Sequence, residues 1–438
     1  VAAVAMASAV EPVMGEAFAD TNKAAIVYIE GSTPKYREWI PSAGGGGSWS
    51  SPVSLTAADT TLNTAKIEFS PVSSKRVIVT MDNNGNLDSY VCSIGCTDAS
   101  SWTFTNNFVD VTASTVTASY RPWDIEYEHT SGDLMIVYDY PESGSSATDD
   151  LFYRIMTNSQ TSFGSESSIN DSGNSATAGL YSFVAMDSQK TSGSDEMALI
   201  AVDATASDAS AIVWNGNNWT TLPQTELSTS VSIATEEAVA IAYETNSGDI
   251  LVVAGEGSNI RYNTFSNTSN TWGTSSTSAG TWAVGTINWV RLVPDPRSTS
   301  NAIFLAGSGS SNDLDSAYWS GSAWTDHAEH DAGISGNAAR VFDFAWDGSS
   351  SNGVLAWSTA SNSISFTRGD PSSGTFGTDG TFTVDADAST TSWIRLASNP
   401  TTADTVAALG LEDDGNSDIG GIRWDGSTNA PVSTGTDD

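Results

Sequence analysis

The stretch Trp289–Trp324, WVRLVPDPRSTSNAIFLAGSGSSNDLDSAYWSGSAW, decides the fold of this 438-residue chain. It contains three short apolar or alternating runs, separated by turns rich in Ser, Asn, Asp, Gly and Pro, and Trp324 opens a fourth, more polar run. Short runs bounded by such turn residues are typical of antiparallel strands joined by hairpins. The stretch therefore predicts a four-stranded antiparallel meander.

Related stretches recur along the chain at a period of roughly 50 residues. One with the same form begins at Trp393 as WIRLASNP, and a second form, with a Ser-Gly-Asp turn after its first run, begins at Trp123 and at Ala238. The two forms alternate, so the repeating unit can be a pair of copies. Such repeats predict an all-β fold, a single β-propeller of about eight four-stranded blades. An open solenoid of sheets is the alternative.

The start of the chain reads differently from the repeats. A degenerate first copy has its opening strand at Pro12–Ala19, so residues 12–438 are assigned to the propeller. Residues 1–11 begin VAAVAMASAV and are predicted to form a short apolar N-terminal arm, either a helix or an assembly segment. An exposed apolar arm is stabilised by packing on another subunit, which predicts self-association. The predicted assembly contacts are Val1, Val4, Met6 and Val10.

The composition limits the possible partners. Hydrophobic residues make up only 39% of the chain, but 15 Trp, 12 Tyr and 14 Phe can fill a core with aromatic rings. The net charge of -36 arises because 16 Lys and Arg face 52 Asp and Glu. A surface with so few cations cannot replace the counterions of phosphate groups, which excludes nucleic acids and anionic membrane surfaces as partners. No run reaches the roughly 18 apolar residues that a membrane-spanning helix needs.

The two cysteines, Cys92 and Cys96, enclose a short turn with Gly95. Two thiolates alone cannot complete a tetrahedral metal site, so this spacing predicts a disulfide. A disulfide indicates an extracellular or cell-surface location. Candidate N-glycosylation sequons occur at Asn170, Asn218 and Asn267.

Two pairs of tryptophans each bracket a four-residue hairpin, Trp214 with Trp219 and Trp319 with Trp324. Such spacing brings two indoles close together across adjacent strands. Because the pairs recur with the repeat, we favour a structural role. The alternative is a ligand-binding role, in which exposed indoles stack against sugar rings.

Several predicted hairpin turns are rich in Asp, Asn and Gly. Calcium takes about six to eight oxygen ligands, which such turns can supply in part. The same residues are those that tight turns require, and we favour the turn. His327 and His330 are three residues apart and would point to opposite faces of a strand, so they predict no metal site. No cofactor is predicted, and the alternative calcium loops are Asp82, Asn84, Asn86 and Asp88, and Asp413, Asp414, Asn416 and Asp418.

The segments Ala242–Asp249, Trp289–Pro294 and Trp393–Pro400 follow the patterns A-Y-E-x-x-S-G-D and W-[VI]-R-L-x-x-[DN]-P. Their alternation resembles that of uncharacterised secreted and surface repeat propellers in environmental bacterial and archaeal sequences. The resemblance covers most of the chain from about residue 12. It implies secretion and a surface role, and it brings no known catalytic residues.

The sequence leaves three hypotheses for the function. The first hypothesis is a non-enzymatic extracellular structural protein, such as the repeating subunit of a cell-surface filament. The second is a carbohydrate-binding adhesin that uses the repeat tryptophans, with glycans as partners. The third is a propeller glycoside hydrolase or lyase, which is disfavoured because the Ser-x-Asp-x-Gly-x-x-Trp box of sialidase-like propellers is missing from the sequence.

Overall fold

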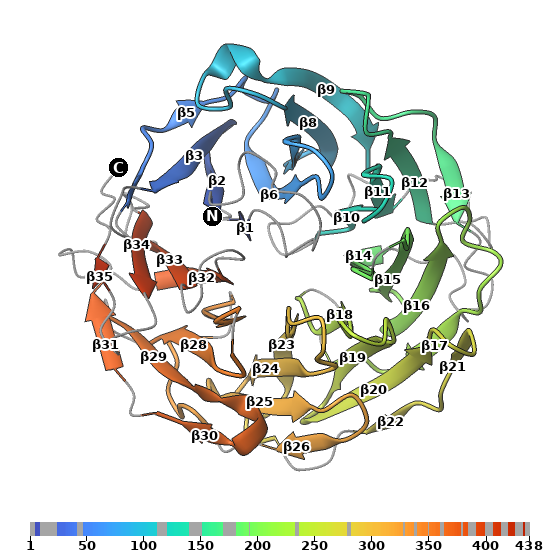
Figure 1. The fold of residues 1–438 in the computed structure, drawn as a ribbon, viewed down its shortest axis with the longest axis vertical. Helices are drawn as coiled ribbons and strands as arrows, with labels where there is room; N and C mark the ends of the chain where they lie inside the picture. Colours follow the sequence, from blue (N-terminus) through green and yellow to red (C-terminus); the bar gives the residue numbers. More distant parts are fainter. Residues whose placement is uncertain are drawn as a thin grey trace.

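The structure is a computed structural model of the whole chain. The residues that it describes are 5–8, 24–41, 47–111, 121–139, 151–169, 181–191, 193–232, 236–277, 282–326, 329–336, 340–348, 350–359, 363–377, 380–383, 391–398, 406–412, 419–424 and 432–433. Within this part of the chain the strands form eight antiparallel sheets, and the sheets stand as blades around a central axis (Figure 1). The predicted β-propeller is confirmed, with eight blades.

The first four blades are built as follows. Blade 1 consists of β1 (Ala5–Ser8), β2 (Ala24–Glu30), β3 (Thr33–Pro41), β4 (Gly47–Trp49) and β5 (Val53–Ser54). Blade 2 consists of β6 (Leu62–Phe69), β7 (Arg76–Asp82), β8 (Asn86–Cys92), the 3-10 helix η1 (Ala99–Ser101) and β9 (Thr103–Asp110). Blade 3 consists of β10 (Trp123–Tyr127), β11 (Leu134–Asp139), β12 (Leu151–Met156) and β13 (Ser167–Ile169). Blade 4 consists of β14 (Tyr181–Ser188), β15 (Glu196–Asp203), β16 (Asp208–Asn215) and β17 (Thr225–Ser228).

The last four blades continue the pattern. Blade 5 consists of β18 (Val239–Tyr243), β19 (Ile250–Glu256), β20 (Asn259–Ser266), β21 (Thr271–Trp272) and β22 (Ser276–Thr277). Blade 6 consists of β23 (Ile287–Pro294), β24 (Ile303–Gly309), β25 (Leu314–Trp319) and β26 (Trp324–Asp326). Blade 7 consists of β27 (Phe342–Trp346), β28 (Gly353–Ser358), β29 (Ser363–Asp370), the 3-10 helix η3 (Pro371–Ser373), β30 (Thr375–Phe376) and β31 (Gly380–Thr383). Blade 8 consists of β32 (Thr391–Ser398), β33 (Val406–Glu412), β34 (Ile419–Trp424) and β35 (Val432–Ser433).

Each described sheet is made of consecutive strands, with the first strand innermost (Figure 1). The innermost strands contact one another around the ring, and β1 contacts both β6 of blade 2 and β32 of blade 8. The ring therefore closes by packing of blade 8 against blade 1, and no described strand of one terminus is inserted into the sheet of the other.

Blade 1 corrects the predicted boundary of the propeller. The innermost strand of this blade is Ala5–Ser8, which pairs with β2 in the register Ala5↔Val27. Four residues of the predicted arm are thus a propeller strand, whereas Pro12–Ala19 lies outside the described residues. The sequence AMAS gave no strand signal because it contains no β-branched or aromatic residue. Of the predicted assembly contacts, Val1, Val4 and Val10 also lie outside the described residues, and Met6 belongs to β1.

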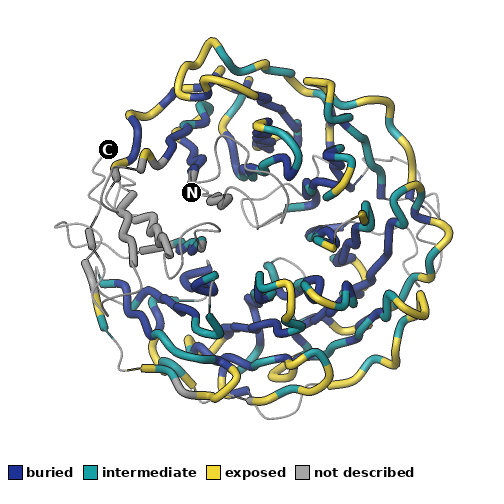
Figure 2. Tube along the Cα trace, in the orientation of Figure 1, coloured by how far each residue is buried: buried dark blue, intermediate teal, exposed yellow. Residues whose placement is uncertain are grey.

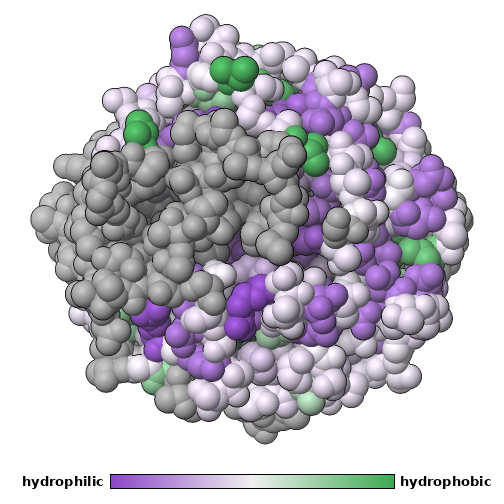
Figure 3. All heavy atoms as spheres, in the orientation of Figure 1, coloured by the Kyte–Doolittle hydropathy of each residue, from purple (hydrophilic) through white to green (hydrophobic). Residues whose placement is uncertain are grey.

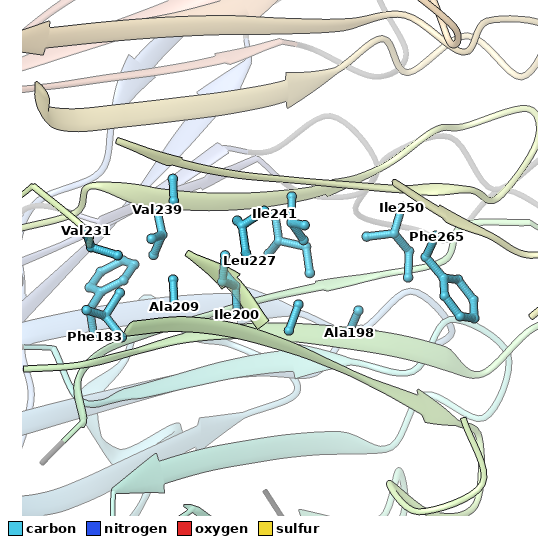
Figure 4. Close-up of a cluster of buried hydrophobic side chains, with 14 of the residues drawn as sticks. Phe183, Ala198, Ile200, Ala209, Leu227, Val231, Val239, Ile241, Ile250 and Phe265 are labelled. Atoms are coloured by element: carbon cyan, nitrogen blue, oxygen red, sulfur yellow. The ribbon is translucent and has the colours of Figure 1, made fainter. Parts of the chain in front are cut away.

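The core lies between the blades. Middle strands such as β7 (RVIVTMD) and β11 (LMIVYD) are buried along their whole length, because neighbouring blades cover both of their faces. The exposed residues gather at the rim and in the connecting turns (Figure 2). At the blade 4/5 interface, for example, Phe183 and Ile200 face Val239 and Ile241 from the adjacent sheet (Figure 4).

Odd and even blades are joined by a repeated backbone hydrogen bond. The carbonyls of Arg121, Glu237 and Arg340, each two residues before the innermost strand of an odd blade, accept bonds from the next even blade. The donors are the backbone amides of Val184, Val290 and Ile394, at distances of 3.1, 2.9 and 3.4 Å. The pairs 3–4, 5–6 and 7–8 therefore share one geometry, in agreement with the alternating sequence forms.

The predicted disulfide is present between Cys92 and Cys96, at the outer end of β8. Trp102 donates its indole Nε1–H to the carbonyl of Cys96 at 2.9 Å, which fixes the end of the loop. Ile94, at the tip, is 82% exposed. The bridge itself is buried, because Cys92 and Cys96 are 1% and 2% exposed and belong to the hydrophobic cluster between blades 1 and 2. Only the tip of the hairpin that it closes lies at the surface.

Reducing this disulfide is expected to leave the ring folded. The two cysteines are only four residues apart, and so short a loop gives an entropic stabilisation of about 2 kcal/mol. Urea unfolding of the native protein and of a Cys92→Ser/Cys96→Ser variant would measure the difference. Loss of the cooperative transition in the variant would contradict a local role, and two free thiols in native material would contradict the bridge itself.

Candidate functional site

The four repeat tryptophans lie close together in pairs, as predicted. The ring centres of Trp214 and Trp219 are 5.5 Å apart, and those of Trp319 and Trp324 are 5.2 Å apart. Three of the rings are buried, with exposed fractions of 3%, 2% and 4% for Trp214, Trp219 and Trp319. The predicted structural role agrees with this burial. The alternative, a sugar platform formed by all four rings, would need three rings that the neighbouring blade covers. Only Trp324 is partly exposed.

The first tryptophan of each pair donates a hydrogen bond to a glutamate carboxylate of the preceding odd blade. Trp214 donates its Nε1–H to Oε1 of Glu128, and Trp319 donates its Nε1–H to Oε1 of Glu244, both at 2.7 Å. Burial raises the pKa of Glu128 to about 7 and also raises that of Glu244. Because the same bond recurs in blades 4 and 6, these two tryptophans are structural.

A tyrosine from the odd blade completes each cluster. Tyr262 on β20 lies 5.7 Å from Trp319 and 5.6 Å from Trp324, measured between ring centres. Tyr153 on β12 contacts the blade 4 pair in the same way. The indole nitrogens of Trp219 and Trp324 are buried and have no hydrogen-bond acceptor among the described residues. The clusters differ in access, because Trp219 is buried while Tyr262 and Trp324 are both partly exposed.

The two partly exposed rings at the blade 5/6 interface define the candidate site. Tyr262 pairs in register with Ser276 of the short outer strand β22, and Ser276 is exposed. The site therefore combines two aromatic rings from adjacent blades with the hydroxyl group of Ser276 at its edge. The hairpin spacing predicts Trp324 as a candidate ligand-binding residue. It does not predict that Tyr262 of the preceding blade lies beside it.

The first candidate calcium loop is a hydrogen-bonded turn. Oδ1 of Asp82 accepts hydrogen bonds from the backbone N–H groups of Asn84 and Asn86. Its Oδ2 accepts hydrogen bonds from Nδ2 of Asn86 and from the hydroxyl of Thr60. Burial raises the pKa of Asp88 to about 6. In the described part of the chain, no group of three or more His, Cys, Asp or Glu side chains could hold a metal ion. The second candidate calcium loop lies outside the described residues; it comprises Asp413, Asp414, Asn416 and Asp418. His327 also lies outside them, whereas Nε2 of His330 forms a hydrogen bond with the hydroxyl of Ser316.

Charged side chains form a second cluster on the innermost strands. Asp343 of β27 is fully buried and accepts a hydrogen bond from the Leu396 amide of blade 8 at 3.0 Å. Its Oδ1 lies 3.1 Å from Nε of Arg291 in blade 6 and 3.6 Å from Nη1 of Arg340 in its own blade. Asp124 makes equivalent contacts in blades 2 to 4. Each of these two aspartates thus links three consecutive blades.

Glu237 connects opposite sides of the ring. Its Oε1 lies 3.7 Å from Nε of Arg121 in blade 3, and its Oε2 lies 3.6 Å from Nε of Arg340 in blade 7. Blades 3 and 7 are opposite in an eight-membered ring, so this carboxylate must lie near the axis. Burial lowers the pKa of Arg340, and the carboxylates of Asp343 and Glu237 partly offset that effect. In the sequence these are three charged residues, each two positions before the inner strand of blade 3, 5 or 7, but only the closed ring brings them together.

No protein-family model and no curated protein matches the chain. Among solved structures, the BP39L lectin of Burkholderia pseudomallei is similar over 99% of this chain and 98% of its own, with 8% identity and a TM-score of 0.56. The fucose-specific lectin of Aleuria aurantia matches 75% of this chain and 94% of its own, with 12% identity and a TM-score of 0.41. A prolyl endopeptidase matches 90% of this chain and 53% of its own, with 7% identity and a TM-score of 0.48. The first likeness supports the propeller fold over the full length, and the other two are too distant to add to it.

Proposed function

We propose that this protein is a secreted, non-enzymatic carbohydrate-binding propeller, with a sugar site at Tyr262 and Trp324 on the blade 5/6 interface. The observation that carries the proposal is the pair of partly exposed rings from adjacent blades. The full-length likeness to a propeller lectin supports it. This reading replaces the filament subunit as the first choice, because Ala5–Ser8 of the predicted assembly arm forms the innermost strand of blade 1.

The physical chemistry of the site suits a sugar ring. Pyranoses have an apolar face of C–H groups, which packs on aromatic rings. Their hydroxyl groups can form hydrogen bonds at the polar edge, which Ser276 provides here. On the described part of the face seen in Figure 3, hydrophobic side chains form only small, separate patches on a mainly hydrophilic surface. The net charge of -36 repels acidic glycans, so we infer a neutral glycan as the ligand.

The proposed location outside the cell follows from the chemistry of the chain. The disulfide is stable in an oxidising compartment. In the described part of the chain, no helix is long and apolar enough to span a membrane. The resemblance of the alternating repeats to secreted and surface propellers agrees with this location.

Replacing Tyr262 with alanine is expected to weaken binding of a neutral glycan about tenfold, which corresponds to about 1.4 kcal/mol. The loss follows because one of the two stacking surfaces is removed. A glycan array would identify the ligand, and calorimetry with that ligand would compare the variants. Tyr153→Ala is the matched control, because it removes the equivalent ring beside the buried Trp219 and should leave affinity unchanged.

The two parts of the proposal can fail separately. An array without any bound glycan would contradict carbohydrate binding altogether. Binding that survives Tyr262→Ala in a folded protein, as judged by circular dichroism, would contradict this site but not the activity.

A further inference from the structure

Asn218 lies in the hairpin after β16, in the sequon Asn218-Trp219-Thr220. Its Oδ1 accepts hydrogen bonds from the backbone amides of Thr220 and Thr221 at 3.1 and 3.0 Å, and from their hydroxyls at 3.2 and 2.7 Å. All four hydrogen bonds are accepted by Oδ1, so the side-chain nitrogen Nδ2 of Asn218 takes no part in them. Asn218 is partly exposed, and Asn217 and Thr220 beside it are exposed. A substituent on this nitrogen can therefore extend into solvent.

Asn267 has the same kind of sequon, Asn267-Thr268-Ser269, and is also partly exposed, but its amide nitrogen has a different environment. Its backbone amide donates to Oδ1 of Asp249 at 2.8 Å. Its Nδ2 lies against Gly248, where an added Cβ would stand only 3.1 Å from that nitrogen. The φ angle of Gly248 is +73°, so the tight turn that approaches Nδ2 needs a glycine.

The equivalent position in blade 3 shows that Asn267 is a structural residue of the repeat. Asn158 donates its backbone amide to Asp133 at 2.7 Å, and its side chain lies against Gly132. Blade 3 has no sequon at this position, since Asn158 is followed by Ser159 and Gln160. The sequon at Asn267 thus arises from a turn residue that happens to precede Thr268 and Ser269.

We propose that Asn218 is an N-glycosylation site of the folded protein and that Asn267, despite its sequon, is not. The donor is a lipid-linked oligosaccharide diphosphate. The Asn218 amide nitrogen forms a bond to C1 of the first sugar and loses a proton to a base, while the bond from C1 to the diphosphate oxygen breaks and the lipid diphosphate leaves. A glycan on Asn267 would have to displace the Gly248 turn at the blade 4/5 interface, where Gln189 donates to the Gly248 carbonyl at 3.2 Å.

The test is secretion of the full chain from yeast, which N-glycosylates secreted proteins, in an Asn170→Gln background that removes the third sequon. Folded, monodisperse protein would be purified and its peptides analysed by mass spectrometry with and without endoglycosidase. We expect glycan at Asn218 in most molecules and none at Asn267. Thr220→Ala should remove the mass increment completely, and the matched variant Ser269→Ala should leave it unchanged.

Two results would overturn the inference. One is folded protein that carries glycan at Asn267. The other is folded protein with an unmodified Asn218, as seen from an intact mass that Thr220→Ala changes only by the mass of the substitution itself. Comparing the secreted fraction with the retained cell fraction separates the two sites further, because glycan on Asn267 should occur only in chains that fail to fold.

Discussion

Replacing Asp343 with alanine is expected to lower the free energy of unfolding by about 3–5 kcal/mol, as for other buried ion pairs that lose one partner. Arg340, which is 1% exposed, would keep its charge but lose one of its two carboxylate partners, with only Glu237 left at 3.6 Å. The Leu396 amide would lose its acceptor, and Arg291 would lose its link between blades 6 and 7. Urea unfolding at pH 7 measures the change as a shift of the midpoint.

The double variant Arg340→Met/Asp343→Ala tests the cause of that loss. Removing the buried charge together with its partner should restore part of the stability, because an apolar side chain needs no counter-charge. Glu329→Ala, at an exposed carboxylate, is the surface control and should change stability by about 0.5 kcal/mol or less. A double variant no more stable than Asp343→Ala would contradict the electrostatic explanation and favour a packing defect.

The protein is expected to be more stable at pH 5.5 than at pH 8, by several kcal/mol. Burial raises the pKa of Glu128, Glu196 and Glu236 to about 7 and that of Asp88 to about 6. The folded state holds these protons more tightly than the unfolded chain, so stability increases as the pH falls through these values and is lost as it rises. After allowance for solvent screening, each group contributes on the order of 1 kcal/mol. The reduced repulsion within a chain of net charge -36 acts in the same direction.

Thermal unfolding across pH 5–8 would measure this effect. The Glu128→Gln/Glu196→Gln variant should show a flatter profile, since two of the titrating groups are gone while their size is kept. A melting temperature that is constant or increases from pH 5.5 to pH 8 would contradict the assignment of these buried carboxyls as protonated in the folded state.

Local pattern predicted much of this fold. The turn residues and short runs of Trp289–Trp324 define the four strands of blade 6, and their recurrence predicts the number of blades. The exception is Ala5–Ser8, whose small side chains carry little strand propensity. There the strand is determined by its position against β2, β6 and β32, and that contact is tertiary.

The candidate site was harder to predict, for a geometric reason. The spacing of Trp319 and Trp324 predicts that the indoles meet, because a hairpin determines that distance. The burial of Trp319 depends on blade 5, which contributes Tyr262, a residue that precedes Trp319 by 57 positions. Glu237 presents the same difficulty, because its partners come from blades 3 and 7. Contacts across the ring follow from its closure, which a single repeat does not encode.

The alternation of blade types also has a consequence for how such rings can change in size. The backbone carbonyls of Arg121, Glu237 and Arg340 stand just before the innermost strands of odd blades. Each accepts a hydrogen bond from a backbone amide of the blade that follows. Duplication or deletion of the gene segment for one blade would place two odd or two even blades next to each other. One of these carbonyls or amides would then lose its hydrogen-bond partner. Gain or loss of two blades preserves every match. Rings of ten or six blades are therefore within reach of a single duplication or deletion of a blade pair, whereas an odd-membered ring requires a new kind of interface.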